Sequence, residues 1–343
     1  MNEKDPLGLV REASDRLAAG VQRWLYRLTE QSFNADILKQ IQLSRVMFGH
    51  TINEPVSGTF SPREILQRAL SEPARTSAWL EVLFSRSDKL RGRVEQLWER
   101  RVEFAELAKL DPHQIESCCR QSQEVAQKWL DRTHDATAEL GARSLADLIQ
   151  LALARDASDG WPIRLTPRSL VHWLDLGAVF RDIKLGHFPL APALGAASFL
   201  RALARLGAAW VEATAPDHLP YTISHDPYGL EERTFGALLA LLPTQPSFLR
   251  RRMGLGKLRA REYQRLLART VLIESRASAL RLLLRPAALR GWRDFERAYQ
   301  ELGEYCLGFP LEKHQAGLIF APREDADQRF SGLLLAASRA DWL

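Results

Sequence analysis

Cysteine is scarce in this sequence of 343 residues, and long apolar runs are missing. The three cysteines, Cys118, Cys119 and Cys306, are odd in number with one adjacent pair, which argues against a disulfide framework. We therefore expect a reducing, cytoplasmic compartment in which the cysteines are small buried side chains. The longest apolar runs are too short for a membrane span, and the first residues lack the apolar stretch of a signal peptide.

Motifs of the common enzyme classes are also missing. The sequence contains no His-Glu-x-x-His pair of a zinc peptidase, no G-x-x-x-x-G-K-[ST] phosphate loop and no G-x-S-x-G nucleophile elbow. It has no Cys-x-x-Cys pair for structural zinc. The segment GLGK at 254–257 has the wrong spacing for a phosphate loop and is typical of a turn between helices. Our leading interpretation therefore includes no cofactor.

Strand patterns are almost absent. Only the segments PYTIS at 220–224 and GLIFA at 317–321 resemble short strands, and neither shows a sustained alternation of apolar and polar residues. Hydrophobic content of 46% and charged content of 26% are those of an ordinary globular protein. The sequence predicts an all-α fold with two helical domains.

The first predicted domain covers residues 1–155 and is an N-terminal helical bundle. Apolar residues recur at spacings of three and four in this part of the chain, which is the pattern of packed helices. Pro73, Asp111 and Gly141 mark helix ends. We expect a long antiparallel hairpin of two of these helices. The predicted helices cover 6–29, a segment from 34, a segment from 61, 76–110, 112–141 and 144–154.

The second predicted domain covers residues 160–343. The segment 155–167 contains two prolines, a glycine and several Asp and Ser residues, so it is the best candidate for a linker. Thr166 followed by Pro167 then predicts a helix start. The predicted helices of this domain cover 167–185, 193–214, 230–242, 246–253, 256–284, 287–306, 311–319 and 325–342.

Positive charge is concentrated in residues 250–290. The segment has twelve basic residues against Glu262 and Glu274, a net charge of +10, whereas the whole chain has +5. Such a segment can attract nucleic acid, an anionic membrane or an acidic partner, or can pack against acidic helices of the same chain. We expect a basic binding face formed by Arg250, Arg251, Arg252, Lys257, Arg261, Arg265, Arg269 and Arg276.

The segment 257–284 has no glycine or proline and is rich in Leu, Ala and Arg, so it predicts one long basic helix. With about 100° of rotation per residue, Arg265, Arg276 and Arg269 lie within about 80° of Arg261. The leucines Leu266, Leu267, Leu280 and Leu284 occupy the arc that should pack inward.

Glu274 lies on the apolar side of this helical wheel, about 220° from Arg261. An isolated buried carboxylate is too costly to keep, so Glu274 needs a partner. One interpretation is a structural ion pair, with Arg281 as the first candidate. The other is a metal ligand or general base in a pocket between helices.

A polar loop at 217–229 supports this second interpretation. It holds Asp217, His218, His225 and Asp226 within ten positions, and metal sites combine such ligands from different segments. His218, His225 and Glu274 would then form the zinc site of a divergent metal-dependent hydrolase. The alternative is a turn at Asp226-Pro227 with solvated histidines.

Our leading hypothesis is a non-catalytic scaffold or adaptor that binds the acidic surface of a partner protein through the basic helix. The metal-dependent hydrolase is one alternative. Nucleic-acid binding without sequence preference is another, although only Tyr263 and Trp292 could stack on bases in this segment.

Overall fold

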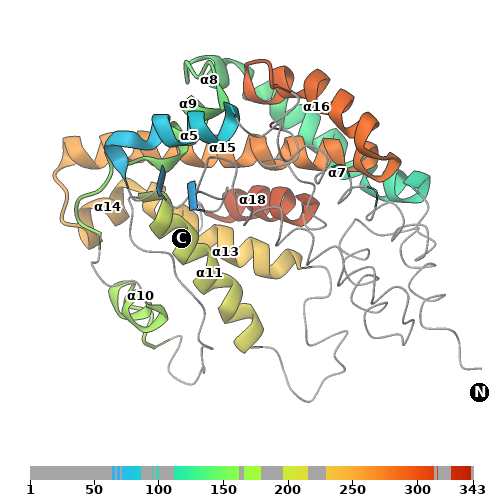
Figure 1. Cartoon of the computed structure of the whole chain (residues 1–343). Coiled ribbons are helices and arrows are strands. Elements are labelled where there is room, and N and C mark those ends of the chain that lie inside the picture. The colour runs from blue at the N-terminus through green and yellow to red at the C-terminus, as the bar shows by residue number, and fades with distance from the viewer. Residues whose placement is uncertain are drawn as a thin grey trace, which may run out of the picture. The chain divides into compact units, whose positions relative to one another are not determined.

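Every regular element in the described part of the chain is a helix, which confirms the predicted all-α fold (Figure 1). The computed structural model describes residues 64–65, 68–69, 72–85, 95, 99, 112–161, 166–178, 196–214, 229–312, 315 and 326–340. The helices expected before residue 64 and both strand-like segments lie outside these residues. The predicted hairpin lies partly outside them.

Most helices predicted within the described ranges are confirmed. The exposed-to-buried alternation follows the spacing of their apolar residues, as in α9, where Leu145 and Leu148 are buried. The helices of the first half are the 3₁₀ turn η1 (Pro73–Arg75), α5 (Thr76–Ser85), α7 (Pro112–Arg132), α8 (His134–Ala138) and α9 (Leu145–Leu153). Those of the second half are α10 (Pro167–Trp173), α11 (Ala196–Ala213), α13 (Leu230–Leu241), the 3₁₀ turn η3 (Leu242–Thr244), α14 (Pro246–Arg252), α15 (Lys257–Arg290), α16 (Trp292–Leu307) and α18 (Ala326–Ala340).

The start of α10 follows from its local sequence. The hydroxyl of Thr166 accepts a hydrogen bond from the backbone N–H of Ser169, and the Ser169 hydroxyl accepts one from the backbone N–H of Thr166. This reciprocal capping box satisfies two N–H groups that a helix start leaves without partners. The expected start at Thr166 and Pro167 is therefore confirmed, whereas α10 itself ends at Trp173, before the predicted end at 185.

Helix α15 is longer than predicted, because it continues through Pro286 to Arg290. Proline removes one hydrogen bond from a helix and usually ends it. Here the residues around it, Leu282, Leu284 and Ala287, are all buried. Packing on all sides offsets the lost hydrogen bond, and the helix ends instead at Gly291, whose φ of 121° favours glycine.

The predicted helix 112–141 is interrupted once. Helix α7 ends at Arg132 and α8 begins at His134, with Thr133 between them. The Thr133 hydroxyl donates to the carbonyl of Trp129 at 2.7 Å, a local bond that competes with the regular helix. Gly141 has a φ of 65°, in agreement with its expected role at the end of this region.

The chain divides into two compact units, and α15 contributes to both. One unit contains residues 1–148 and 276–327, and the other contains residues 149–275 and 328–343. The residues of α15 up to Ser275 belong to the second unit, and those from Arg276 onward belong to the first. The predicted division at residues 155–160 stays a prediction.

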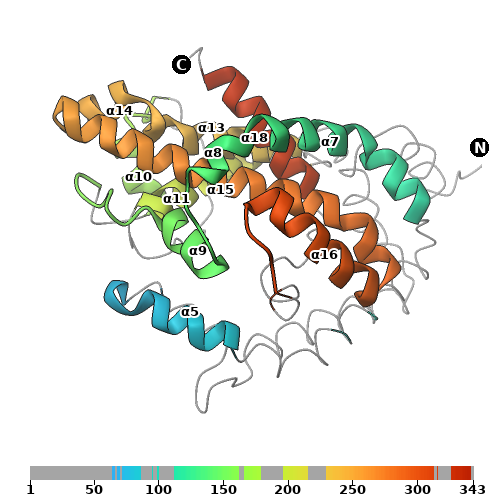
Figure 2. The same cartoon turned by 90° about the horizontal axis from the view of Figure 1, so that it is seen from above.

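In the second unit, α11 and α13 lie side by side in both views (Figures 1 and 2). Two glycines allow their backbones to approach closely. A Cβ atom on Gly207 would lie 2.4 Å from the carbonyl oxygen of Phe235, and one on Gly236 would lie 2.6 Å from that of Ala204. Beside this contact, α10 and α11 bury Leu170, Leu203 and Leu206 together.

The segment expected to be a linker carries tertiary contacts instead. Ala157 and Trp161 are buried in the same apolar cluster as Phe199 of α11 and Tyr263 of α15. The rings of Trp161 and Phe199 are stacked, with centroids 4.6 Å apart. Residues 154–161 thus form a packed turn of the second unit.

Among the described residues, none of the helices combines the length and apolar character needed to cross a lipid bilayer.

Candidate functional site

A tight turn joins α14 to α15 at one end of the second unit (Figures 1 and 2). The basic residues of α14 and of the start of α15 lie on either side of this turn. Met253 is buried, and the backbone N–H of Leu255 donates to the carbonyl of Leu249. Gly254 has a φ of 66°, which glycine adopts without strain. The turn predicted for this segment is therefore observed.

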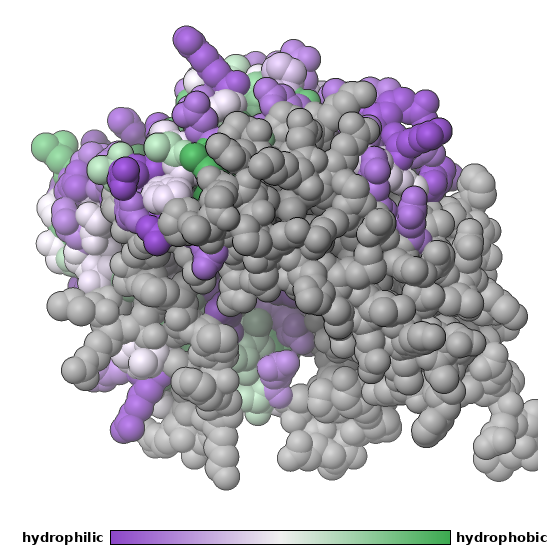
Figure 3. Space-filling model, viewed as in Figure 1, coloured by the Kyte–Doolittle hydropathy of each residue, from purple (hydrophilic) through white to green (hydrophobic). Residues whose placement is uncertain are grey.

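Seven of the eight residues expected on the basic face lie on α14 and the first half of α15. Arg250, Arg251, Arg252, Lys257, Arg261 and Arg265 are exposed, and Arg269 is partly exposed. In Figure 3 the left-hand end of the molecule, where Figure 1 shows α14 and the start of α15, carries hydrophilic side chains beside a few apolar ones.

Two arginines of this region are bound to carboxylates of the same unit. The guanidinium of Arg252 donates to Asp175 at 3.2 Å, from α14 to the turn that follows α10. Arg259 donates to Glu262 at 2.7 Å and to Asp159 at 3.3 Å. The hydrogen bond that Arg259 donates to Glu262 raises the pKa of the Arg259 guanidinium above its ordinary value. This region therefore binds carboxylates within its own unit.

The other six basic residues of α14 and the first half of α15 have no carboxylate partner among the described residues. Within the described part of the chain, none of them makes an ion pair or a side-chain hydrogen bond. We call these six residues the basic surface: Arg250, Arg251, Lys257, Arg261, Arg265 and Arg269.

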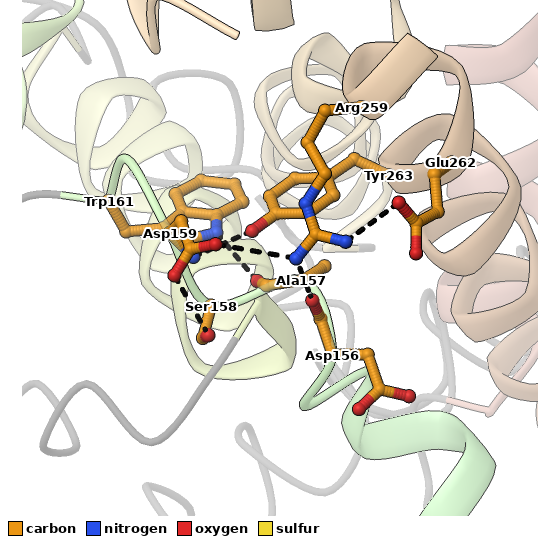
Figure 4. A network of polar contacts seen from close by, with 8 residues as sticks. All are labelled: Asp156, Ala157, Ser158, Asp159, Trp161, Arg259, Glu262 and Tyr263. Atoms are coloured by element: carbon orange, nitrogen blue, oxygen red, sulfur yellow. Dashed lines mark hydrogen bonds and ion pairs between the residues drawn. The ribbon is translucent and has the colours of Figure 1, made fainter.

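A network around Arg259 fixes the turn 154–161 to α15 (Figure 4). The backbone N–H of Asp159 donates to the hydroxyl of Tyr263 at 2.7 Å. The guanidinium of Arg259 also donates to the carbonyl of Asp156 at 3.0 Å, and it lies over the Tyr263 ring, 4.7 Å from the centroid. The indole of Trp161 donates to the carbonyl of Ala157 at 2.9 Å. Several independent contacts therefore hold the start of α15.

Arg276 does not belong to the basic face, so this part of the sequence prediction is wrong. Its side chain is buried, with 1% of its surface exposed. The helical wheel places it near Arg261, but neighbours in the second half of α15, including Ala279, Leu280 and Leu282, are also buried. Buried residues lie on several sides of this half of the helix, so rotation alone does not decide which residues face solvent.

The buried guanidinium of Arg276 binds the C-terminal ends of two helices. It donates to the carbonyls of Tyr305 at 2.8 Å and Cys306 at 2.6 Å, in the last turn of α16. It also donates to the carbonyl of Leu130, at 2.8 Å, and to the hydroxyl of Thr133, at the end of α7. The last carbonyls of a helix lack partners within the helix and carry partial negative charge. A cation is therefore stabilised here without a carboxylate in contact.

Burial shifts the pKa values around Arg276. Desolvation lowers the pKa of the Arg276 guanidinium. It raises the pKa of the Cys306 thiol to about 12 and, together with the hydrogen bond to Asp131, that of the Tyr305 hydroxyl to about 12. The thiol of Cys306 is therefore protonated at neutral pH and is a poor nucleophile. This cluster is structural, and the expected buried position is confirmed for Cys306.

Glu274 is not on a packed face. Its side chain is 47% exposed and lies 3.9 Å from the guanidinium of Arg201 on α11. The expected ion pair thus exists with a different cation and at the surface. The neighbouring Ile273 and Ser275 are buried, so the helical-wheel prediction is wrong for Glu274.

The predicted metal site is not assembled in the described residues. His218 and His225 lie outside them. Within the part of the chain that the structure describes, no three His, Cys, Asp or Glu side chains are grouped so that they could hold a metal ion. Glu274, the third proposed ligand, is half-exposed and lies 3.9 Å from Arg201.

The sequence interpretation missed the acidic residues that contact this region, Asp159 and Asp175. Asp159 precedes Gly160, and this pair is a turn signal. Asp175 has a φ of 60°, a left-handed conformation that Asp tolerates better than most residues. Neither signal says which helix the turn contacts, because the partners are 77 and 100 residues away in the chain.

Relatives of known function would offer independent evidence about this surface. Comparisons of the chain with protein-family models, with curated proteins and with solved structures found no match.

Proposed function

We propose that this chain is a helical scaffold or adaptor that binds an acidic protein through the basic surface at the α14–α15 junction. The observation that carries the proposal is the division of the cations in this region into two groups. Arg252 and Arg259 bind carboxylates of the same unit, whereas the six residues of the basic surface have none among the described residues. A partner with carboxylates on its surface complements this arrangement.

A protein partner fits this surface better than nucleic acid. Tyr263 and Trp161, beside the start of α15, are buried in the apolar cluster, Trp292 is buried as well, and Phe248 of α14 is partly buried. Single-stranded nucleic acids are usually held by exposed aromatic rings on which the bases stack, together with cations. Arg252 and Arg259 in the same region already bind carboxylates of this chain, so arginines here are accessible to carboxylates.

The metal-dependent hydrolase is not carried forward, because no observation favours it.

Binding assays with two probes of equal net charge test the proposal. One probe is a fluorescein-labelled peptide rich in glutamate, and the other is a single-stranded oligonucleotide. The full chain should bind the peptide, and binding should weaken as salt is added, because exposed charges are screened. Changing Arg261, Arg265 and Arg269 to Glu should abolish it.

A matched control distinguishes this surface from net charge alone. Arg120, Lys128 and Arg143 are also exposed and lie in the other unit. Changing these three to Glu alters the net charge equally and should leave peptide binding within about twofold, since none of them belongs to the basic surface. An equal loss of peptide binding in both variants would overturn the proposal. So would tighter binding of the oligonucleotide than of the peptide, if the change at Arg261, Arg265 and Arg269 abolishes that binding.

A further inference from the structure

The outward side of α15 carries a row of residues with an apolar residue at each end. The inward side of the helix buries Ala260, Tyr263, Leu267 and Thr270, at spacings of three, four and three residues. On the other side, spacings of three, four, three and four place five residues in one row along the helix. We call these residues the outer seam: Leu258, Arg261, Arg265, Ala268 and Leu272.

The outer seam is open to solvent. Leu258 is 82% exposed, which is the largest exposure among the exposed large apolar residues of the described chain. Arg261, Arg265 and Ala268 are exposed, and Leu272 is partly buried. At about 1.5 Å per residue, Leu258 and Leu272 are about 21 Å apart along the helix axis. The seam therefore has two apolar ends with two cations between them.

We infer that the outer seam docks an acidic amphipathic helix of the partner. Leucine-sized side chains of that helix pack on Leu258 and Leu272, and its carboxylates face Arg261 and Arg265. This inference rests on the proposed function and adds the shape and pattern of the partner to it. An occupant of about 15 residues, four helical turns, spans the distance between the apolar ends.

Charge selects this occupant over a second copy of the chain. Two copies of the outer seam would bring Arg261 and Arg265 of one copy against the same residues of the other, and facing like charges are destabilising. An acidic helix instead places opposite charges at the centre of the contact. The buried leucines supply the apolar area that ion pairs at an exposed site do not.

Two peptides of identical composition test the inference. Each contains alanine, glutamate and two leucines, carries a fluorescent label and has capped ends. In the first, the leucines are 14 residues apart and share one helical face with two glutamates between them. In the second, the order is scrambled so that leucine and glutamate do not share a face. Anisotropy gives the Kd of each for the full chain.

The first peptide should bind at least about tenfold more tightly than the scrambled one, a difference of about 1.4 kcal/mol. Leu258→Ser should remove most of this preference and leave the affinity for the scrambled peptide unchanged. Val125→Ser is the matched control, because Val125 is an exposed apolar residue of α7 in the other unit. It should leave both affinities unchanged. Melting curves verify that both variants remain folded.

The outcomes separate this inference from the proposed function. Equal binding of the two peptides, unaffected by Leu258→Ser, would overturn the helical docking mode and leave an acidic partner in place. If neither peptide binds the wild-type chain in low salt, the acidic partner itself is wrong, and the docking mode fails with it.

Discussion

The Nε of Arg276 donates a hydrogen bond to the backbone carbonyl of Cys306 at 2.6 Å, although neither side chain is near solvent. This bond joins the middle of α15 to the end of α16. With the bonds to Leu130 and Thr133, it connects the ends of two helices through one guanidinium. Arg276, which the sequence predicts on the basic face, therefore stabilises the packing of the first unit.

Arg276→Met should lower the free energy of unfolding by roughly 2–4 kcal/mol, because it leaves several buried oxygen acceptors without their donor. Arg276→Lys keeps the charge but supplies fewer donors, so it should recover only part of the loss. Urea unfolding measures both values. Arg261→Met is the matched control at an exposed position and should change stability by less than about 0.5 kcal/mol. A loss under about 1 kcal/mol for Arg276→Met would contradict the supporting role.

Tyr263→Phe should release the turn 154–161. It removes the hydroxyl that accepts from the backbone N–H of Asp159, at a cost of about 1–2 kcal/mol. Trypsin should then cleave after Arg155 faster than in the wild-type chain. Tyr305→Phe is the control, because it also removes a hydrogen-bonded hydroxyl, the one bound to Asp131. If both variants expose Arg155 to the same extent, the bond to Asp159 does not hold the turn.

Gly207→Ala should destabilise the second unit. The added methyl group would meet the backbone of Phe235 at 2.4 Å, and backbone cannot move aside as a flexible side chain does. We expect a loss of roughly 1–3 kcal/mol, typical of an overpacked core. Gly177→Ala is the control, because no atom lies within 4 Å of its added Cβ. Equal melting temperatures for the two variants would show that α11 and α13 are not in close contact.

The burial of Cys306 predicts a dependence of stability on pH. Its thiol has a pKa of about 12 in the fold, against 9.0 for an ordinary thiol, so the folded state binds its proton more tightly than the unfolded state. The resulting stabilisation is complete below pH 9.0 and is lost as the pH rises toward about 12. The stability difference between wild type and Cys306→Ala should therefore fall by up to about 1.4 kcal/mol per pH unit in this window. Urea unfolding at pH 8 and pH 10.5 measures it, and a constant difference would refute the buried thiol.

The helical fold and most helix boundaries in the described ranges follow from the amino-acid sequence alone. These are local properties, since a capping residue such as Thr166 and a spacing of three and four residues act within one or two turns. The sequence also predicts that Lys257, Arg261 and Arg265 share one side of a helix, because rotation per residue is nearly constant. Pro286 is one exception, where burial of the surrounding residues prevailed over the local preference.

Which charged residues face solvent depends on how the helices pack together. Arg261 and Arg276 occupy similar positions on the helical wheel, yet one is exposed and the other is buried against the ends of α7 and α16. Glu274 was expected to face the core and instead contacts Arg201 at the surface. The periodicity of a helix gives the direction of each side chain relative to its neighbours. What lies in that direction depends on elements distant in the sequence, and a local pattern contains no information about them.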